Sequence, residues 1–147
     1  MASQGLTGPP EIWDELVVNG GLTIPDNKPP MERLLGYKIE YEITKAEVIA
    51  TKLMSDDQPP MPIRKVIVDG TARIKVKYVA DVPDQQVHGA HFDVPFNKLL
   101  EWPGGPAPGT PICVEVVEEH VQIHMLDPRH LSKTIVIQLI VTVNKPC

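Results

Sequence analysis

The sequence predicts an all-β protein, built as an antiparallel β-sandwich with an extended N-terminal arm. Several stretches alternate apolar and polar residues with a period of two, as strands with one buried and one solvated face do. Turn-forming residues separate these stretches, and no amphipathic helix pattern interrupts them. The 147 residues include 16 prolines, which disrupt helix interiors and imply frequent turns. This length fits one domain.

Residues 1–21 are predicted to form the arm, and residues 22–147 the single domain. Residues 1–10 are mostly small and polar, and a short apolar patch follows them before Asn19-Gly20-Gly21 marks a turn. The patch either folds back onto its own domain or pairs with the next subunit, where a donated strand would extend a sheet edge. The candidate residues for an intersubunit contact are Ile12, Trp13, Leu16, Val17 and Val18.

Two alternating stretches predict the first long strands of the domain. In residues 37–43 the apolar positions have odd numbers, whereas beyond them the apolar positions have even numbers, which predicts a β-bulge or bend near Thr44-Lys45. Residues 55–62 (SDDQPPMP) are predicted to be a loop. Residues 66–80 repeat the alternation, and Asp69-Gly70 within them suggests another bulge.

The next stretch, residues 87–96, also alternates. Pro95 has no N–H donor and is expected to end the pairing there, and a short helical turn could follow as far as Trp102. Residues 103–109 are rich in proline and glycine and are predicted to form a surface loop.

The last two strands are predicted at residues 112–126 and 131–143, with a turn at Asp127-Pro128-Arg129 between them. Most residues from 134 to 143 are β-branched, which favours a strand over a helix. Both faces of this last strand are apolar, so we expect it to lie in the centre of a sheet.

Charge and hydropathy exclude several classes of partner. The net charge is −5, the sign least suited to a polyphosphate, so we expect no nucleic-acid partner. The longest uncharged apolar run, residues 134–143, is half of what a membrane helix needs, so we expect no membrane insertion. The first residues show neither the basic nor the apolar segment of a secretory signal peptide.

No catalytic or cofactor-binding motif is recognisable in the sequence. It lacks a P-loop, a GxGxxG after a strand and an HExxH, and none of its serines lies in a GxSxG elbow. Cys113 lies in an apolar strand, where a thiol is usually an inert core residue rather than a nucleophile. We therefore expect a protein that is not an enzyme and binds no cofactor.

Two pairs of histidines are the candidates for a metal site. Neighbouring strands carrying one pair each could ligate zinc or copper, but no cysteine or carboxylate completes the set at a recognisable spacing. We favour a solvated face or an interface and expect no bound metal. The four candidates are His88, His91, His120 and His124.

A basic stripe lies on one face of residues 66–80. Such a stripe can follow a phosphate backbone, but the negative net charge and the lack of interleaved aromatic residues argue against this. We favour pairing across the sheet with acidic faces such as that of Glu40 and Glu42, or that of Glu115 and Glu118. The stripe consists of Lys65, Arg73, Lys75 and Lys77.

Four segments together carry a family resemblance. They are residues 22–35 (LTIPDNKPPMERLL), 66–81 (VIVDGTARIKVKYVAD), 87–96 (VHGAHFDVPF) and 117–131 (VEEHVQIHMLDPRHL). In order and content they resemble the SPOCS domain family of spore-forming Firmicutes, over about residues 12–145 and in a single copy. The resemblance implies a role in assembly of the spore coat or spore envelope, and it brings no catalytic residues with it.

The leading hypothesis is therefore a structural protein of the spore surface, in the coat, the exosporium or an appendage. It would assemble with itself, and with other spore coat proteins, into a layer or fibre through strand or arm exchange. The resemblance implies synthesis in the mother-cell cytoplasm, which needs no signal peptide. Cys147 is a candidate for an intersubunit disulfide, and the alternative is an idle thiol.

The competing hypothesis is a carbohydrate- or peptidoglycan-binding module that recruits coat components. Sandwiches of this kind bind sugars on an aromatic face, whereas aromatic residues make up only 5% of this chain. Exposure of Trp102 to solvent beside a tyrosine would support this alternative.

Overall fold

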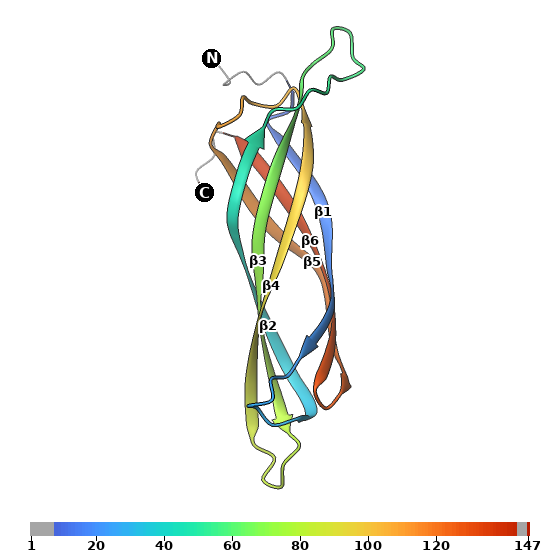
Figure 1. Cartoon of the computed structure of the whole chain (residues 1–147), viewed down its shortest axis with the longest axis vertical. Coiled ribbons are helices and arrows are strands. Elements are labelled where there is room, and N and C mark those ends of the chain that lie inside the picture. The colour runs from blue at the N-terminus through green and yellow to red at the C-terminus, as the bar shows by residue number, and fades with distance from the viewer. Residues whose placement is uncertain (1–7, 144–146) are drawn as a thin grey trace.

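The computed structural model describes residues 8–143 and Cys147. Over this range the chain forms two antiparallel three-stranded sheets, with the strand orders β1-β6-β5 and β2-β3-β4. Figure 1 shows the sheets packed face to face along an elongated molecule, which confirms the predicted all-β sandwich. No helix in the described part of the chain could span a membrane. The strands are β1 (Glu11–Thr23), β2 (Met31–Ile49), β3 (Ile63–Ala80), β4 (Val87–Pro103), β5 (Ile112–Asp127) and β6 (His130–Val143).

The hydrophobic core lies between the two central strands, β3 and β6. Alternate residues of each strand point into this space, while the other face of β3 is mostly charged. Fully burying one Val, Leu or Ile side chain contributes about 1.5–3 kcal/mol, so these strands supply much of the hydrophobic stabilisation. The buried residues are Val66, Val68, Ala72, Ile74, Val76 and Tyr78 of β3, and Leu131, Ile135, Ile137, Leu139 and Val141 of β6. The predicted central position of the last strand is confirmed.

A bulge in β2 changes which of its residues face the core. The register against β3 shifts between Ile43 and Lys45, as the sequence predicts, and Val48 beyond it is buried. Gly70 lies opposite Ile43, but β3 itself has no register shift against β4 there. A Cβ at Gly70 would collide with the Phe96 ring. This glycine therefore allows a close approach of side chain and backbone instead of forming the second bulge that we predicted.

Strand β4 continues through the proline that was expected to end it. Pro95 pairs with Thr71, and the strand runs on to Pro103, so both the expected stop and the helical turn before Trp102 were wrong. The reason is that β4 is an edge strand, where a missing N–H donor is tolerated.

Residues 11–21, predicted as an arm, form most of β1 in the same sandwich. β1 pairs with β6 from Glu11–Thr142 to Thr23–His130. The single chain thus shows the folded-back arrangement, one of the two that the sequence allows, and donation to a neighbour stays a prediction. The part of the predicted arm in residues 1–7 lies outside the described residues.

Hydrogen bonds hold the connection between β1 and β2 against the end of the sandwich. Ile24 is fully buried in it. Arg129, in the predicted turn between β5 and β6, donates from Nη1 to the carbonyl oxygens of Pro25 (3.1 Å) and Lys28 (3.0 Å). The Tyr78 hydroxyl donates to the carbonyl oxygen of Pro29 (2.8 Å). In the folded-back chain this connection is therefore packed against the rest of the domain.

Candidate functional site

The outer face of the β1-β6-β5 sheet carries an apolar surface. Trp13 and Val17 of β1 are 57% and 55% exposed, although each side chain is large and apolar. On the neighbouring strand Trp13 lies opposite Ile140, and Val17 lies opposite Val136. We call these four residues the β1 patch. Large exposed apolar residues gathered on one face are candidates for a contact surface, and here Glu15 and Gln138 separate the two pairs.

The structure divides the five predicted contact residues between the two faces of β1. Trp13 and Val17 point outwards, whereas Val18 is buried and Ile12 and Leu16 pack against the core. The division follows from the strand period, which turns successive side chains to opposite faces. Of the five residues, Trp13 and Val17 are therefore the two that present exposed side chains on the outer face while β1 stays in its own sheet.

Polar contacts link the edges of the two sheets where they approach each other. Between β2 and β5, the Tyr41 hydroxyl donates to Glu118 Oε2 (2.6 Å). Burial and the neighbouring Glu118 carboxylate raise the pKa of Tyr41 above its ordinary value, so the donor keeps its proton. Between β4 and β1, Lys98 Nζ lies 3.4 Å from Asp14 Oδ2. Each sandwich corner is therefore joined by side chains, while the backbone edges stay unpaired within the described chain.

A groove of about 820 Å³ runs between β2 and β5, and a disulfide forms part of its wall. Cys113 and Cys147 are bonded to each other within the chain, with their Cα atoms 5.3 Å apart. This differs from both sequence-based alternatives, an intersubunit disulfide through Cys147 and an idle thiol. The reason lies in the hairpin register: Cys113 lies opposite Thr142, close in sequence to Cys147. The register of β5 against β6, which the sequence alone does not provide, was needed to predict this bond.

The four histidines do not come together. His88 faces the interior, where its ring stacks on Tyr78 with centroids 6.1 Å apart. His91, three residues further on, lies on the outer face of the same sheet, opposite Lys75. His120 and His124 lie on the outer face of the other sheet, opposite Val136 and Ser132. The described residues contain no group of three or more metal-ligating side chains.

Ion pairs neutralise only part of the basic stripe on β3. Arg73 donates from Nη2 to both carboxylate oxygens of Glu42 (3.1 Å each), as the cross-sheet pairing predicts. Lys75 instead lies between Lys38 and His91 on the neighbouring strands. Neither Lys75 nor Lys77 forms an ion pair with any described residue.

Trp102 does not meet the condition set for a sugar-binding face. Its side chain is fully buried, and its indole N–H donates to the carbonyl oxygen of Pro9 (2.8 Å). Gly8 N–H also donates to the carbonyl oxygen of Gly104 (2.7 Å). Trp102 therefore anchors residues 8–10 to the end of the sandwich instead of presenting an aromatic platform.

The fold and this surface define a small β-sandwich protein with exposed edges and an apolar outer patch. The model of the SipL, SPOCS domain family matches residues 30–126 of the chain, which span β2 to β5. The chain belongs to the SPOCS domain family, and this membership indicates a sporulation-related role and a spore-associated location. Comparison with curated proteins and with solved structures gives no match.

Proposed function

We propose that this chain is a non-enzymatic structural protein of the bacterial spore surface. It assembles with copies of itself into a coat layer or fibre through exchange of β1 between subunits, and it contacts other spore coat proteins. Membership of the SPOCS domain family supports the link to sporulation. The location at the surface, the self-assembly and the partners are our proposal.

The proposal rests on the edge position of β1 and on its exposed apolar side chains. β1 is an edge strand, and among the described residues only those of β6 pair with it along its length. Its outward residues Trp13 and Val17 are exposed apolar side chains that solvent disfavours. In an exchanged assembly, β1 of one copy takes the same place beside β6 of the next copy. All backbone pairs are kept. The patch then combines Trp13 and Val17 of one copy with Ile140 and Val136 of the next on the same outer face, where its exposed apolar area packs against a further copy.

A cysteine pair across β1 and β6 tests the exchange. Val17 and Val136 lie opposite each other, so Val17→Cys with Val136→Cys places two thiols across this strand pair. Oxidation of assembled protein is expected to give a ladder of covalent multimers on a denaturing gel without reductant. Val17→Cys alone is the control, because it lacks the facing thiol.

Electron microscopy of the purified chain tests the assembly itself. We expect regular fibres or layers from the natural chain, and their loss in Trp13→Gln, which removes apolar area without removing a backbone bond. Leu126→Gln is the matched control, since Leu126 is 65% exposed on the opposite edge strand. Covalently closed monomers from assembled protein would contradict exchange, and discrete monomers under all conditions would contradict self-assembly. Antibody labelling of intact spores tests the surface location.

A further inference from the structure

One cross-strand row on the outer face of the β2-β3-β4 sheet holds three nitrogen bases. Lys38 of β2 lies opposite Lys75 of β3, and Lys75 lies opposite His91 of β4. Like charges in directly opposite positions destabilise a sheet. Lys38 Nζ is 3.3 Å from Glu40 Oε1, but no carboxylate of the described chain reaches Lys75. In a protein of net charge −5, this concentration of positive charge fits an anionic partner.

The surface is hollowed beside this row. In the next row Lys77 stands between Gly36 and Gly89, two residues without side chains. A Cβ at Gly36 would meet no atom within 4 Å. The hollow has a volume of about 430 Å³, and Leu35, which is 45% exposed, contributes an apolar part of its lining. We call the site formed by Leu35, Lys38, Lys75 and Lys77 the basic depression.

The loop between β2 and β3 has the complementary chemistry. Its tip carries the adjacent carboxylates of Asp56 and Asp57, and Lys52 near its start is the one basic residue within residues 50–62. Met54 beside them is 55% exposed. Two hydrogen bonds brace the loop, from Ser55 N–H to the Met61 carbonyl oxygen (2.8 Å) and from Met61 N–H to Ser55 Oγ (2.9 Å). Figure 1 shows the loop projecting from one end of the molecule.

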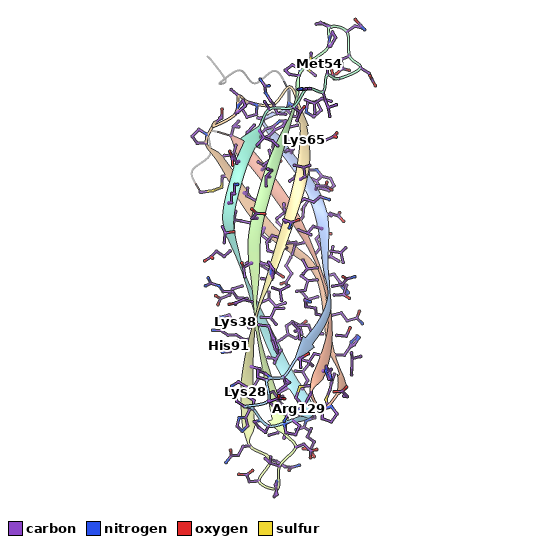
Figure 2. The ribbon with its side chains drawn as sticks, viewed as in Figure 1. Lys28, Lys38, Met54, Lys65, His91 and Arg129 are labelled. Carbon is purple, nitrogen blue, oxygen red and sulfur yellow. A yellow bond between two sulfur atoms is a disulfide. The ribbon has the colours of Figure 1, made fainter. Side chains whose placement is uncertain are left out.

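We propose that the 50–62 loop of one copy docks in the basic depression of the next copy. This inference rests on the proposed self-assembly and names one of its contacts. Figure 2 places Met54 at one end of the molecule, and Lys38 and His91 beyond its middle towards the other end, so a loop does not fill its own depression. The two surfaces differ, and a repeated contact between unlike surfaces produces an open fibre when its rotation does not close a ring. Because the contact is electrostatic, salt weakens it.

Charge reversal tests the contact in the full chain at low salt. Asp56→Lys with Asp57→Lys makes loop and depression both basic, and Lys75→Glu with Lys77→Glu makes both acidic. Each variant alone is expected to raise the concentration needed for assembly by about tenfold or more, measured by sedimentation velocity. An equal mixture of the two variants restores opposite charges at every contact, so it is expected to assemble like the natural chain.

Lys45→Glu with Lys65→Glu is the matched control for the reversed depression, because it changes the net charge equally outside both the depression and the 50–62 loop. We expect it to assemble like the natural chain. Normal assembly of either reversed variant would overturn the proposal, and so would failure of their mixture to assemble. If only the reversed depression blocks assembly, another acidic group occupies the site and the loop is excluded.

Cross-linking with a carbodiimide separates this inference from the proposed function. The reagent joins carboxylates to amines in contact, and mixing isotope-labelled with unlabelled chains identifies bonds between copies. We expect bonds from Asp56 or Asp57 to Lys75 or Lys77 of another copy. Fibres without these bonds would refute the docking and leave the proposed function standing. The absence of both fibres and bonds would refute both.

Discussion

Breaking the Cys113–Cys147 disulfide is expected to destabilise the domain while leaving the strand pairing intact. The bond closes a loop with a sequence separation of 34 residues. In the chain-entropy description, closing a loop of this length stabilises the folded state by about 4 kcal/mol, because it restricts the unfolded chain. Either reductant or the substitution Cys147→Ser removes this constraint.

Guanidinium unfolding followed by tryptophan fluorescence measures the effect. Trp102 is fully buried and reports the loss of the sandwich, whereas Trp13 is already largely exposed in the folded chain. With a slope of about 4 kcal/mol/M, the loss of about 4 kcal/mol lowers the midpoint by about 1 M. Equal slopes before and after reduction would show that the same amount of surface unfolds.

Two comparisons decide whether this reasoning holds. Reductant should lower the midpoint of the natural chain to that of Cys147→Ser and should leave the variant unchanged. If reductant leaves the unfolding midpoint of the natural chain unchanged, or lowers the midpoint of Cys147→Ser just as far, the bond does not restrain the unfolded chain. Intact mass before and after reduction then shows whether the bond had formed.

Three further substitutions test the packing and the charges of the sandwich. Gly70→Ala is expected to cost about 1–3 kcal/mol in thermal melts, because the added Cβ would lie 2.8 Å from the Glu42 carbonyl oxygen. Lys133→Met is expected to stabilise the fold by about 1 kcal/mol at neutral pH, because burial lowers the pKa of this amine and its charge opposes folding. Since stability of the natural chain rises as the amine loses its proton, this gain should shrink as pH approaches about 10. Tyr41→Phe is expected to cost about 0.5–1.5 kcal/mol in chemical unfolding, because Glu118 loses its donor. The raised pKa of Tyr41 means that the unfolded chain releases this proton first, so natural stability falls above about pH 10, and the variant should fall less.

For each of these three substitutions, one outcome would contradict the predicted effect on stability. Gly36→Ala meets open space, so a loss equal to that of Gly70→Ala would show that crowding is not the cause. A Lys133→Met variant less stable than the natural chain would show that the bond from Lys133 Nζ to the Asn19 carbonyl oxygen (3.3 Å) outweighs the burial of charge. An unchanged stability of Tyr41→Phe would show that solvent replaces the hydroxyl.

The side-chain period predicts those features that depend on one strand alone. The change of phase beyond residue 43 locates the bulge, because an extra residue moves the following apolar set to the other number parity. Residues 134–143 are apolar on both faces, and β6 is the central strand: β1 and β5 flank both of its edges, and their side chains keep its outer face half-buried.

Features that depend on pairing between strands could not be predicted in the same way. The continuation of β4 beyond Pro95 depends on its position at the sheet edge, and the local sequence around Pro95 does not reveal that position. The Cys113–Cys147 bond depends on the register of β5 against β6. The basic depression needs β2 and β3 in register, since Leu35 and Lys38 come from one strand and Lys75 and Lys77 from the other.

The adjacent positions of Glu11 and Thr142 give this sandwich a natural site for circular permutation. Strand β1 begins beside the end of β6, so joining the two termini and opening the chain within residues 50–62 keeps every strand and every ladder. In such a permutant residues 144–147 and 1–10 join β6 to β1, and the two strands become a covalent hairpin. A strand held in a hairpin with its own partner pairs locally, so the permuted chain would favour self-contained units over exchanged ones.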